Sequence, residues 1–516
     1  MTKLSREARP ALPSRPAGDL TLRAGSRNTA RSTPGEEAPI QPKLLLIAMP
    51  DKASCFDRLI DMPNLGLCSI AGNVEDLTNH IRILDLSLHR KSIARIVERE
   101  LSVSDPDVVG LSSMSFQYES AKRIARLCRH WKKGTLVALG GYHATLMYRE
   151  IADSADGTMF DFLIRGEGER VFHELLLALK TPSGSFASIK GLSYRSADGF
   201  HHNPPAPLAD LEQVKLPARG YRISDSFRFM GKKFDCIETS RGCLQRCSFC
   251  SIQRMYGSAF RVYPVARVIT DLQSLKAAGV QGVFIVDDNI TSNIGRLKEL
   301  CRAIIGAGLE DLDYIVQASV SGIASDPELA PLMSKAGFQL VFLGIESGSG
   351  KNLKAMRKAA GSRNAASAVS LLRSAGIVVI GGLIVGNPDD QAADVRAAFR
   401  YAFELGLDHA IVQCLTPYPG TELRETLLRE GLVANAHDFS RYNGFIANVR
   451  TRHLRPEQIA RAIWSSGIRL YFHPGYLLRS RMWRVYRHMW FGLMTKSLGL
   501  AVSVFGNNLY RSRHRF

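Results

Sequence analysis

The feature that most constrains the fold is a repeated alternation of short apolar runs with helix-sized intervals. In the first half of the chain these runs cover residues 43–50, 81–85, 107–113, 136–141 and 162–168. Runs that are apolar throughout, rather than alternating with polar residues, are typical of strands buried on both faces. The alternation of such strands with helices predicts an α/β fold with a doubly wound, Rossmann-like parallel sheet.

Six further units of the same kind follow in the second half. Their apolar runs cover residues 235–242, 282–288, 314–320, 340–346, 378–386 and 409–415. Six strand–helix units predict a partial, open (β/α)6 barrel, in which chemistry collects at the carboxyl ends of the strands. The predicted strand ends are polar, and they include Asp287, Gln317, Glu346, Asn387 and Thr416.

Three cysteines at spacing C-x3-C-x2-C follow the first strand of the second half, at Cys243, Cys247 and Cys250. Thiolates are metal ligands, and so tight a loop can bring three of them to one centre. A four-iron cluster normally takes one cysteine per iron, so three ligands leave one iron with an open position for a substrate or cofactor. Two alternatives stay open: a zinc site with a fourth ligand such as Cys236, and three buried cysteines without a metal.

The predicted strand ends of the first half are small and polar. Ser112, Ser113, Gly140, Gly141 and Gly166 all lie at such ends. Ligands of doubly wound sheets bind outside the carboxyl ends of the strands, where the strand order reverses. The pattern is therefore compatible with a large, flat ligand that approaches the backbone, and equally with ordinary strand–helix turns.

Four motifs of the first half resemble the cobalamin-binding domain of cobalamin-dependent radical SAM enzymes: 63–67, 106–111, 140–145 and 165–169. The resemblance spans about residues 43–190, and it implies that cobalamin is bound there. The Asp-x-His-x-x-Gly signature of cobalt-ligating histidines is not found, so His143 is either a ligand or a hydrogen-bonding turn residue. The residues that the resemblance assigns to cobalamin are Leu65, Ser112, Ser113, Gly140, Gly141, His143, Gly166 and Glu167.

Residues 235–425 resemble the radical SAM superfamily. The resemblance implies that the three cysteines hold a 4Fe-4S cluster whose open iron binds S-adenosylmethionine (SAM), and that reductive cleavage of SAM yields a 5′-deoxyadenosyl radical. It assigns the methionine carboxylate to Arg357 or to its neighbour Lys358. The other residues assigned to SAM are Phe249, Asp287, Gln317, Glu346 and Gly382.

The function that this resemblance implies is methylation of an unactivated carbon on a hydrophobic or natural-product substrate, as in the hopanoid methylases. The alternatives are a radical cyclisation or rearrangement, as in the anaerobic Mg-protoporphyrin ester cyclases, and a non-enzymatic iron–sulfur sensor. A flavodoxin- or ferredoxin-type protein is the expected reductant. Nine cysteines in 516 residues do not suggest a secreted disulfide framework, so we expect a reducing, cytoplasmic environment.

Five segments are expected along the chain: a disordered basic tail over 1–40, a cobalamin-binding domain over 41–190, a linker over 191–234, a radical SAM core over 235–440 and a helical segment over 441–516. The net charge is +19, and ten Lys or Arg against one acid fall within 456–516, together with Trp464, Trp483 and Trp490. This basic, aromatic segment is expected either to cap the barrel or to contact a membrane surface. No nucleic-acid partner is expected, because no RNA-binding module is evident.

Overall fold

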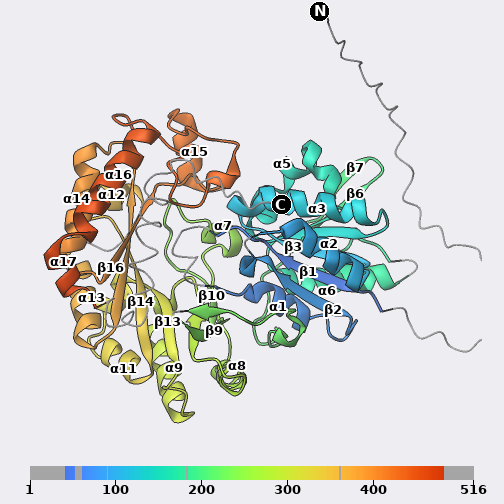
Figure 1. The fold of residues 1–516 in the computed structure, drawn as a ribbon, viewed down its shortest axis with the longest axis horizontal. Coiled ribbons are helices and arrows are strands. Elements are labelled where there is room, and N and C mark those ends of the chain that lie inside the picture. The colour runs from blue at the N-terminus through green and yellow to red at the C-terminus, as the bar shows by residue number, and fades with distance from the viewer. Residues whose placement is uncertain are drawn as a thin grey trace, which may run out of the picture.

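The computed structural model describes residues 41–52, 61–89, 91–181, 184–229, 231–358 and 362–481. Within them the chain forms two seven-stranded sheets, one in each half of the molecule, with helices packed against them (Figure 1). The α/β class and the division into two sheet domains agree with the sequence. The expected basic tail over 1–40 and residues 482–516 lie outside the described residues.

The first sheet has the strand order β2-β1-β3-β4-β5-β6-β7. Its parallel strands are β1 (Leu44–Ala48), β2 (Ile81–Asp85), β3 (Val108–Ser112), β4 (Leu136–Gly140) and β5 (Phe162–Ile164). Since β1 lies between β2 and β3, the strand order reverses at the carboxyl ends of β1 and β3, where ligands of such sheets bind. The antiparallel strands β6 (Leu192–Ser196) and β7 (Gly199–His202) extend the sheet beyond residue 190, into the segment expected as a linker.

Strand β1 shows why these apolar runs form buried strands. Leu45 and Ile47 enter a core with α2 (Ile93–Ser104) and α3 (Tyr118–Trp131). Leu44 and Leu46 point to the other face, into a core with α1 (Leu65–Gly72) and α6 (Gly168–Lys180). Successive side chains of a strand point to opposite faces, so only a run without polar residues can serve both cores.

The second sheet has the order β16-β15-β14-β13-β12-β9-β8, and its parallel strands follow one another in chain order. They are β9 (Lys232–Ile237), β12 (Gly282–Ile285), β13 (Asp313–Ser319), β14 (Phe338–Glu346), β15 (Val378–Val385) and β16 (His409–Cys414). The short β8 (Arg228–Phe229) pairs antiparallel with β9. In the described chain β16 does not pair with β9, so the sheet is the open, partial barrel that the sequence predicts.

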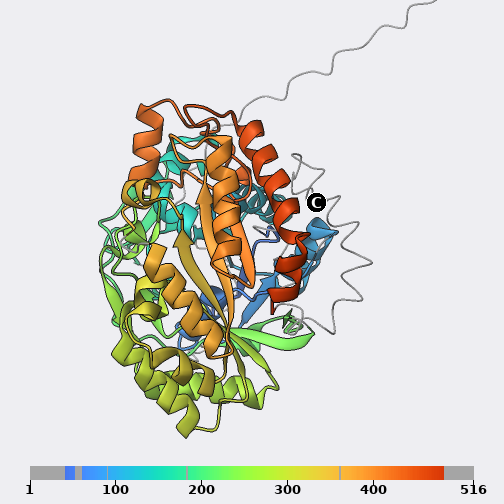
Figure 2. The same ribbon diagram turned by 90° about the vertical axis from the view of Figure 1, so that its left-hand side faces the viewer.

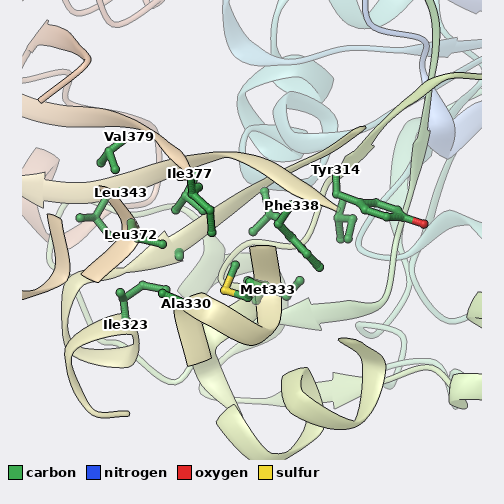
Figure 3. Close-up of a cluster of buried hydrophobic side chains, with 14 of the residues drawn as sticks. Tyr314, Ile323, Ala330, Met333, Phe338, Leu343, Leu372, Ile377 and Val379 are labelled. Carbon is green, nitrogen blue, oxygen red and sulfur yellow. The ribbon is translucent and has the colours of Figure 1, made fainter. Parts of the chain in front are cut away.

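Helices cover the outer face of this sheet (Figures 1 and 2). They are α8 (Val265–Ala277), α9 (Ile294–Gly306), α10 (Val320–Ala324), α11 (Leu329–Lys335), α13 (Ser362–Ser374) and α14 (Ala392–Glu404). The core between them contains Tyr314, Met333, Phe338 and Leu343 (Figure 3). Tyr314 and Val316 point into this core, and the alternation along β13 therefore turns Gln317 toward the inner face.

The C-terminal part of the described chain contains the expected helices, which begin at residue 456, while residues 442–455 form no helix. Helix α15 (Glu422–Arg429) follows the last strand, and α16 (Pro456–Tyr471) and α17 (Pro474–Arg479) pack near α14 on the outer surface. No described helix is both long and apolar enough to cross a membrane. Trp483 and Trp490, on which the membrane-contact hypothesis partly rests, lie outside the described residues.

Candidate active site

The three cysteines of the C-x3-C-x2-C motif line one cavity of about 150 Å³ at the carboxyl ends of the second sheet. Their loop runs from the end of β10 (Ser240–Gly242) to the start of α7 (Ile252–Tyr256). Cys247 is buried, Cys243 and Cys250 are half-buried, and all three are free thiols. Gln317 and Glu346, from the inner face of β13 and β14, complete the cavity wall.

All three thiols line this one cavity. Among the described residues no three His, Cys, Asp or Glu side chains are placed to hold one metal ion. A closed zinc site would need its ligand atoms about 2.0–2.3 Å from a common centre, whereas in a four-iron cluster each thiolate binds a separate iron. Burial raises the pKa of Cys250 to about 12 and raises that of Cys247, so both stay neutral until a cationic metal stabilises the thiolate. The donor set fits a multi-iron group.

A buried ion pair lies in the same cavity. Lys358 Nζ donates to Glu346 Oε1 at 2.9 Å, and the two side chains are only 8% and 12% exposed. Burial opposes the charged lysine, yet the Glu346 carboxylate beside it raises the pKa of Lys358. Gly344 makes room for the pair, because a Cβ there would lie 2.8 Å from Glu346 Oε1. The cavity thus contains a lysine cation that is held in place by a carboxylate.

The other residues expected to contact SAM divide into two groups. Phe249 lines the cavity, as Gln317 and Glu346 do, but Arg357 and Asp287 do not. Arg357 Nη2 instead pairs with Glu422 Oε1 at 2.6 Å, with its side chain 59% exposed. Asp287 accepts hydrogen bonds from the backbone N–H and hydroxyl of Thr239 and from the hydroxyl of Ser240, so its carboxylate joins the end of β12 to the start of β10, just before the cysteine loop.

In both cases the next residue in the sequence lines the cavity instead. Lys358 replaces Arg357 in the cavity wall, and Asp288 replaces Asp287. Burial raises the pKa of Asp288 to about 6, although its Oδ2 accepts from the Gly242 N–H at 3.0 Å. Sequence reasoning could not choose within either pair, because adjacent residues at the end of an element point in different directions.

Gly382 does not line the cavity either. A Cβ on it would lie 2.6 Å from the ring of Phe342, and this ring does line the cavity. The glycine on β15 therefore accommodates an aromatic side chain of β14, and it affects the cavity only through Phe342.

A second cavity, of about 320 Å³, lies over the reversal point of the first sheet. Except for His143, every residue assigned to cobalamin lines it: Leu65, Ser112, Ser113, Gly140, Gly141, Gly166 and Glu167. Gly166 has φ 78°, and a Cβ on it would meet no atom within 4 Å, so the chain leaves open space there. With apolar walls such as Leu111 and Phe172 beside serine and carboxylate groups, the lining fits a large group with an apolar body and polar edges.

His143 is placed away from this cavity. Its side chain is buried, with Nδ1 3.2 Å from Ser115 Oγ and the ring 4.2 Å from that of Tyr118. Burial lowers the pKa of His143 to about 3, so the imidazole is neutral. Of the two hypotheses for His143, the structure favours the hydrogen-bonding turn residue.

The second cavity also has a wall from the other half of the chain. Met255 and Tyr256 of α7 line it, and α7 begins two residues after Cys250. Burial raises the pKa of Tyr142 well above its usual value, and Tyr256, Asp288 and Cys250 lie close enough to raise it further. Tyr142, which the sequence did not single out, lines the larger cavity on the side that faces these residues of the second domain.

Arg241 is a second residue that sequence reasoning missed. Its guanidinium bonds Glu167 Oε1 at 2.8 Å, Glu169 Oε1 at 2.6 Å and Glu238 Oε2 at 2.9 Å. Glu167 also pairs with Arg261 at 2.9 Å. The pairs with Glu167 and Glu169 join the first sheet domain to the second beside the larger cavity, and no local spacing in the sequence predicts them.

Comparisons with known proteins agree with this geometry. Residues 56–176 match the model of the B12 binding domain, and residues 237–402 match that of the Radical SAM superfamily. An uncharacterized methyltransferase of Pyrococcus horikoshii is 28% identical, over 84% of this chain and 94% of its own length. A hopanoid C-3 methylase of Methylococcus capsulatus is 29% identical, over 71% of this chain and 69% of its own length.

Among solved structures, the radical SAM methyltransferase TsrM of Kitasatospora setae, with cobalamin and a [4Fe-4S] cluster bound, is similar with a TM-score of 0.63. It is 20% identical, and the match covers 77% of this chain and 76% of that one. At this identity the similarity concerns the fold. Together with the two family models it confirms the resemblance that the motifs of both halves indicated.

Proposed function

We propose that this chain, which joins a B12-binding domain to a radical SAM domain, is a methyltransferase acting on an unactivated carbon of a small molecule. One observation carries the proposal. The cavity over the reversal point of the first sheet has a wall on α7, which begins just after the cysteine loop, so the two cavities lie on either side of one short helix. Groups bound in them can act on one substrate. The similarity to a hopanoid C-3 methylase and to an uncharacterized methyltransferase supports methyl transfer.

When bound, a 4Fe-4S cluster would supply the electron for the reductive cleavage of SAM, and cobalamin would supply the methyl group. The chain's own residues bind and orient. Cys243, Cys247 and Cys250 are the proposed cluster ligands, and the Asn289 amide, 3.7 Å from Cys243 Sγ, donates toward the first of them. Tyr142 lines the cavity proposed for cobalamin, next to α7.

For SAM, the cavity offers charges of both signs. Lys358 provides a buried cation for the methionine carboxylate, and Asp288 provides a carboxylate for the amino group. Phe249, Gln317 and Glu346 remain proposed contacts because they line the same cavity. Charged groups held in a site of low polarity bind more strongly than they would in water.

Replacing Lys358 by Met tests the carboxylate contact. We expect K358M to weaken SAM binding by about 30-fold or more, since removing one partner of a buried charge pair costs about 2–5 kcal/mol. The matched control is R357M, whose exposed pair with Glu422 contributes about 0–1 kcal/mol. Equilibrium dialysis with labelled SAM measures both. Normal binding by K358M with impaired binding by R357M would assign the carboxylate contact to Arg357.

Gly166→Leu tests the cobalamin cavity. We expect G166L to lose corrin binding, because its side chain would occupy the open space that the glycine leaves. Gly279→Leu is the control: Gly279 has φ 76° and open surroundings as well, so both variants lose about 1–2 kcal/mol of stability from backbone strain alone. Hydroxocobalamin that co-elutes on gel filtration is measured by its absorbance. Equal retention by both variants would remove the corrin from this cavity.

The reaction itself is tested with the reconstituted full chain under anaerobic conditions. We expect SAM, dithionite and hydroxocobalamin to yield both 5′-deoxyadenosine and S-adenosylhomocysteine, detected by mass spectrometry. Deoxyadenosine without S-adenosylhomocysteine would contradict methyl transfer and indicate cyclisation or rearrangement. Neither product from an intact cluster would indicate an iron–sulfur sensor.

The finer assignments of partner and location belong to the same proposal. A flavodoxin- or ferredoxin-type protein in the cytoplasm supplies the electron. The substrate is a lipid or another hydrophobic molecule, reached by peripheral contact of the C-terminal segment with a membrane. Trp464, Phe472 and Leu478 support this contact, with 43%, 68% and 82% of their surfaces exposed at the end of the described chain.

A further inference from the structure

A third cavity, of about 300 Å³, lies between α14 and α16, away from both cofactor cavities. The two helices pack side by side on the outer surface of the second domain (Figure 2). Phe399, Phe403 and Leu470 form an apolar floor. Neither the cysteine loop nor any residue assigned to cobalamin lines it, so the proposed reaction does not explain it.

Three arginines surround this cavity. Arg396 and Arg400 lie one helical turn apart on α14, and Arg469 faces them from α16. In the described structure none of the three has an ion pair or a side-chain hydrogen bond. By contrast, Arg373 on the nearby α13 pairs with Asp408 at 2.6 Å. Like charges one turn apart repel each other, so such a cluster is suited to an anion that neutralises it.

A buried hydroxyl group is the second, independent observation. Ser466 on α16 lines the cavity and is only 4% exposed, yet its Oγ has no hydrogen-bond partner among the described residues. Its neighbour Ser465 donates in the usual way to a backbone carbonyl, that of Ala462, at 3.2 Å. Leaving a buried hydroxyl unpaired is costly, and an acceptor in the cavity would satisfy it.

His473 adds a further donor at the rim. Its Nδ1 accepts from the Gly475 N–H at 3.1 Å, so in the neutral ring the proton lies on Nε2. The cavity therefore offers three guanidinium groups, one hydroxyl and one imidazole N–H, with no acidic side chain among its lining residues.

We propose that this cavity binds the phosphate group of an amphiphilic phosphate ester. Arginine forks match the oxygens of phosphate, and so many donors exceed what the two oxygens of a carboxylate can accept. The floor of Phe399, Phe403 and Leu470 holds the apolar part of the same molecule. A phospholipid headgroup and a free phosphate ester share this chemistry.

The test compares two triple variants of the full chain with its cluster reconstituted. R396Q/R400Q/R469Q removes the three cavity arginines, and R95Q/R126Q/R302Q removes three exposed arginines elsewhere, so the change in net charge is the same. One probe is inorganic phosphate, followed by the shift in Tm. The other is flotation with vesicles of phosphatidylglycerol, compared with vesicles of phosphatidylcholine.

We expect the wild type and the control variant to bind, and the cavity variant to lose at least about tenfold in affinity, since hydrogen bonds to charged groups are lost. Loss in the phosphate arm identifies a free phosphate ester, and loss confined to anionic vesicles identifies a lipid headgroup. Equal behaviour of the two triple variants in both arms, or no binding by the wild type in either, overturns the proposal.

Ser466→Ala separates binding from a structural role. Because the hydroxyl has no partner in the ligand-free chain, we expect S466A to keep or raise the Tm without ligand. Its affinity for the probe that the wild type binds should fall by about tenfold. A lower Tm with unchanged affinity would mean that Ser466 serves only the packing of α16. It would overturn the proposal that this hydroxyl binds the phosphate.

Discussion

Replacing Cys243, Cys247 or Cys250 by alanine is expected to abolish the cleavage of SAM. Each thiol lines the cysteine cavity, and each would bind a different iron, so no remaining side chain can replace the one removed. Anaerobic reconstitution followed by iron analysis, visible absorbance and detection of 5′-deoxyadenosine measures the loss. We expect no 5′-deoxyadenosine above the level formed without protein.

The control for this experiment is Cys301→Ala. Cys301 lies on α9 in the core outside the second sheet and lines neither cofactor cavity. Its replacement should cost about 0.5–3 kcal/mol of stability, as core substitutions commonly do, and leave the cleavage of SAM intact. Full activity of any one of the three motif variants would contradict the cluster assignment.

Arg241→Met is expected to lower the free energy of unfolding by about 3–5 kcal/mol, because it leaves buried carboxylates without their counter-ion. In the described chain Arg241 and Arg261 are the two cations that neutralise Glu167, Glu169 and Glu238. Arg261→Met is the control with the smaller expected effect, since it touches only Glu167 of the three. Denaturant unfolding of each variant gives the difference.

The loss of unfolding free energy in R241M should depend on pH. In the wild type burial favours protonated Glu169, but Arg241 outweighs it and lowers the pKa of that carboxyl. This pair therefore contributes stability above the unfolded pKa of Glu, about 4.3, and loses it as the pH falls through the lower folded pKa.

The effect of Glu238 has the opposite sign, because burial raises its pKa to about 7. The free energy of unfolding therefore falls as the pH rises from about 4.3 to about 7, since the folded state opposes the ionisation of this carboxyl. Without Arg241, burial raises the pKa of Glu169 as it does that of Glu238, so the loss of unfolding free energy should be largest near pH 8 and shrink toward pH 4. A deficit that is the same at both ends would refute the electrostatic account.

Much of the fold could be predicted from the sequence, because a strand that is buried on both faces appears as a short, continuous apolar run. Strand β1 is apolar throughout since both of its faces pack against helices. The inward direction of Gln317 and Glu346 follows from the alternation along β13 and β14, and the cysteine spacing keeps its three thiols around one cavity whatever surrounds it.

Which residue of an adjacent pair lines the cavity could not be predicted, because the side chains of neighbouring residues at the end of an element point in different directions. Arg357 has φ 53° just beyond α12 (Gly350–Ala355), and this turn sends its side chain outward to Glu422 while Lys358 enters the cavity. Asp287 and Asp288 separate in the same way. Nothing within a few residues of either pair shows which member faces inward.

The sequence by itself determined the strands, the two-domain order and the cysteine loop, because periodicity and spacing are local properties. Only the tertiary structure decided which carboxylates meet Arg241, since Glu167 lies 74 residues away in the chain and on the other domain. It also decided that residues of α7 form one wall of the larger cavity. Charge pairs and shared walls depend on how distant elements dock, and docking is the sum of many contacts that no single stretch of sequence contains.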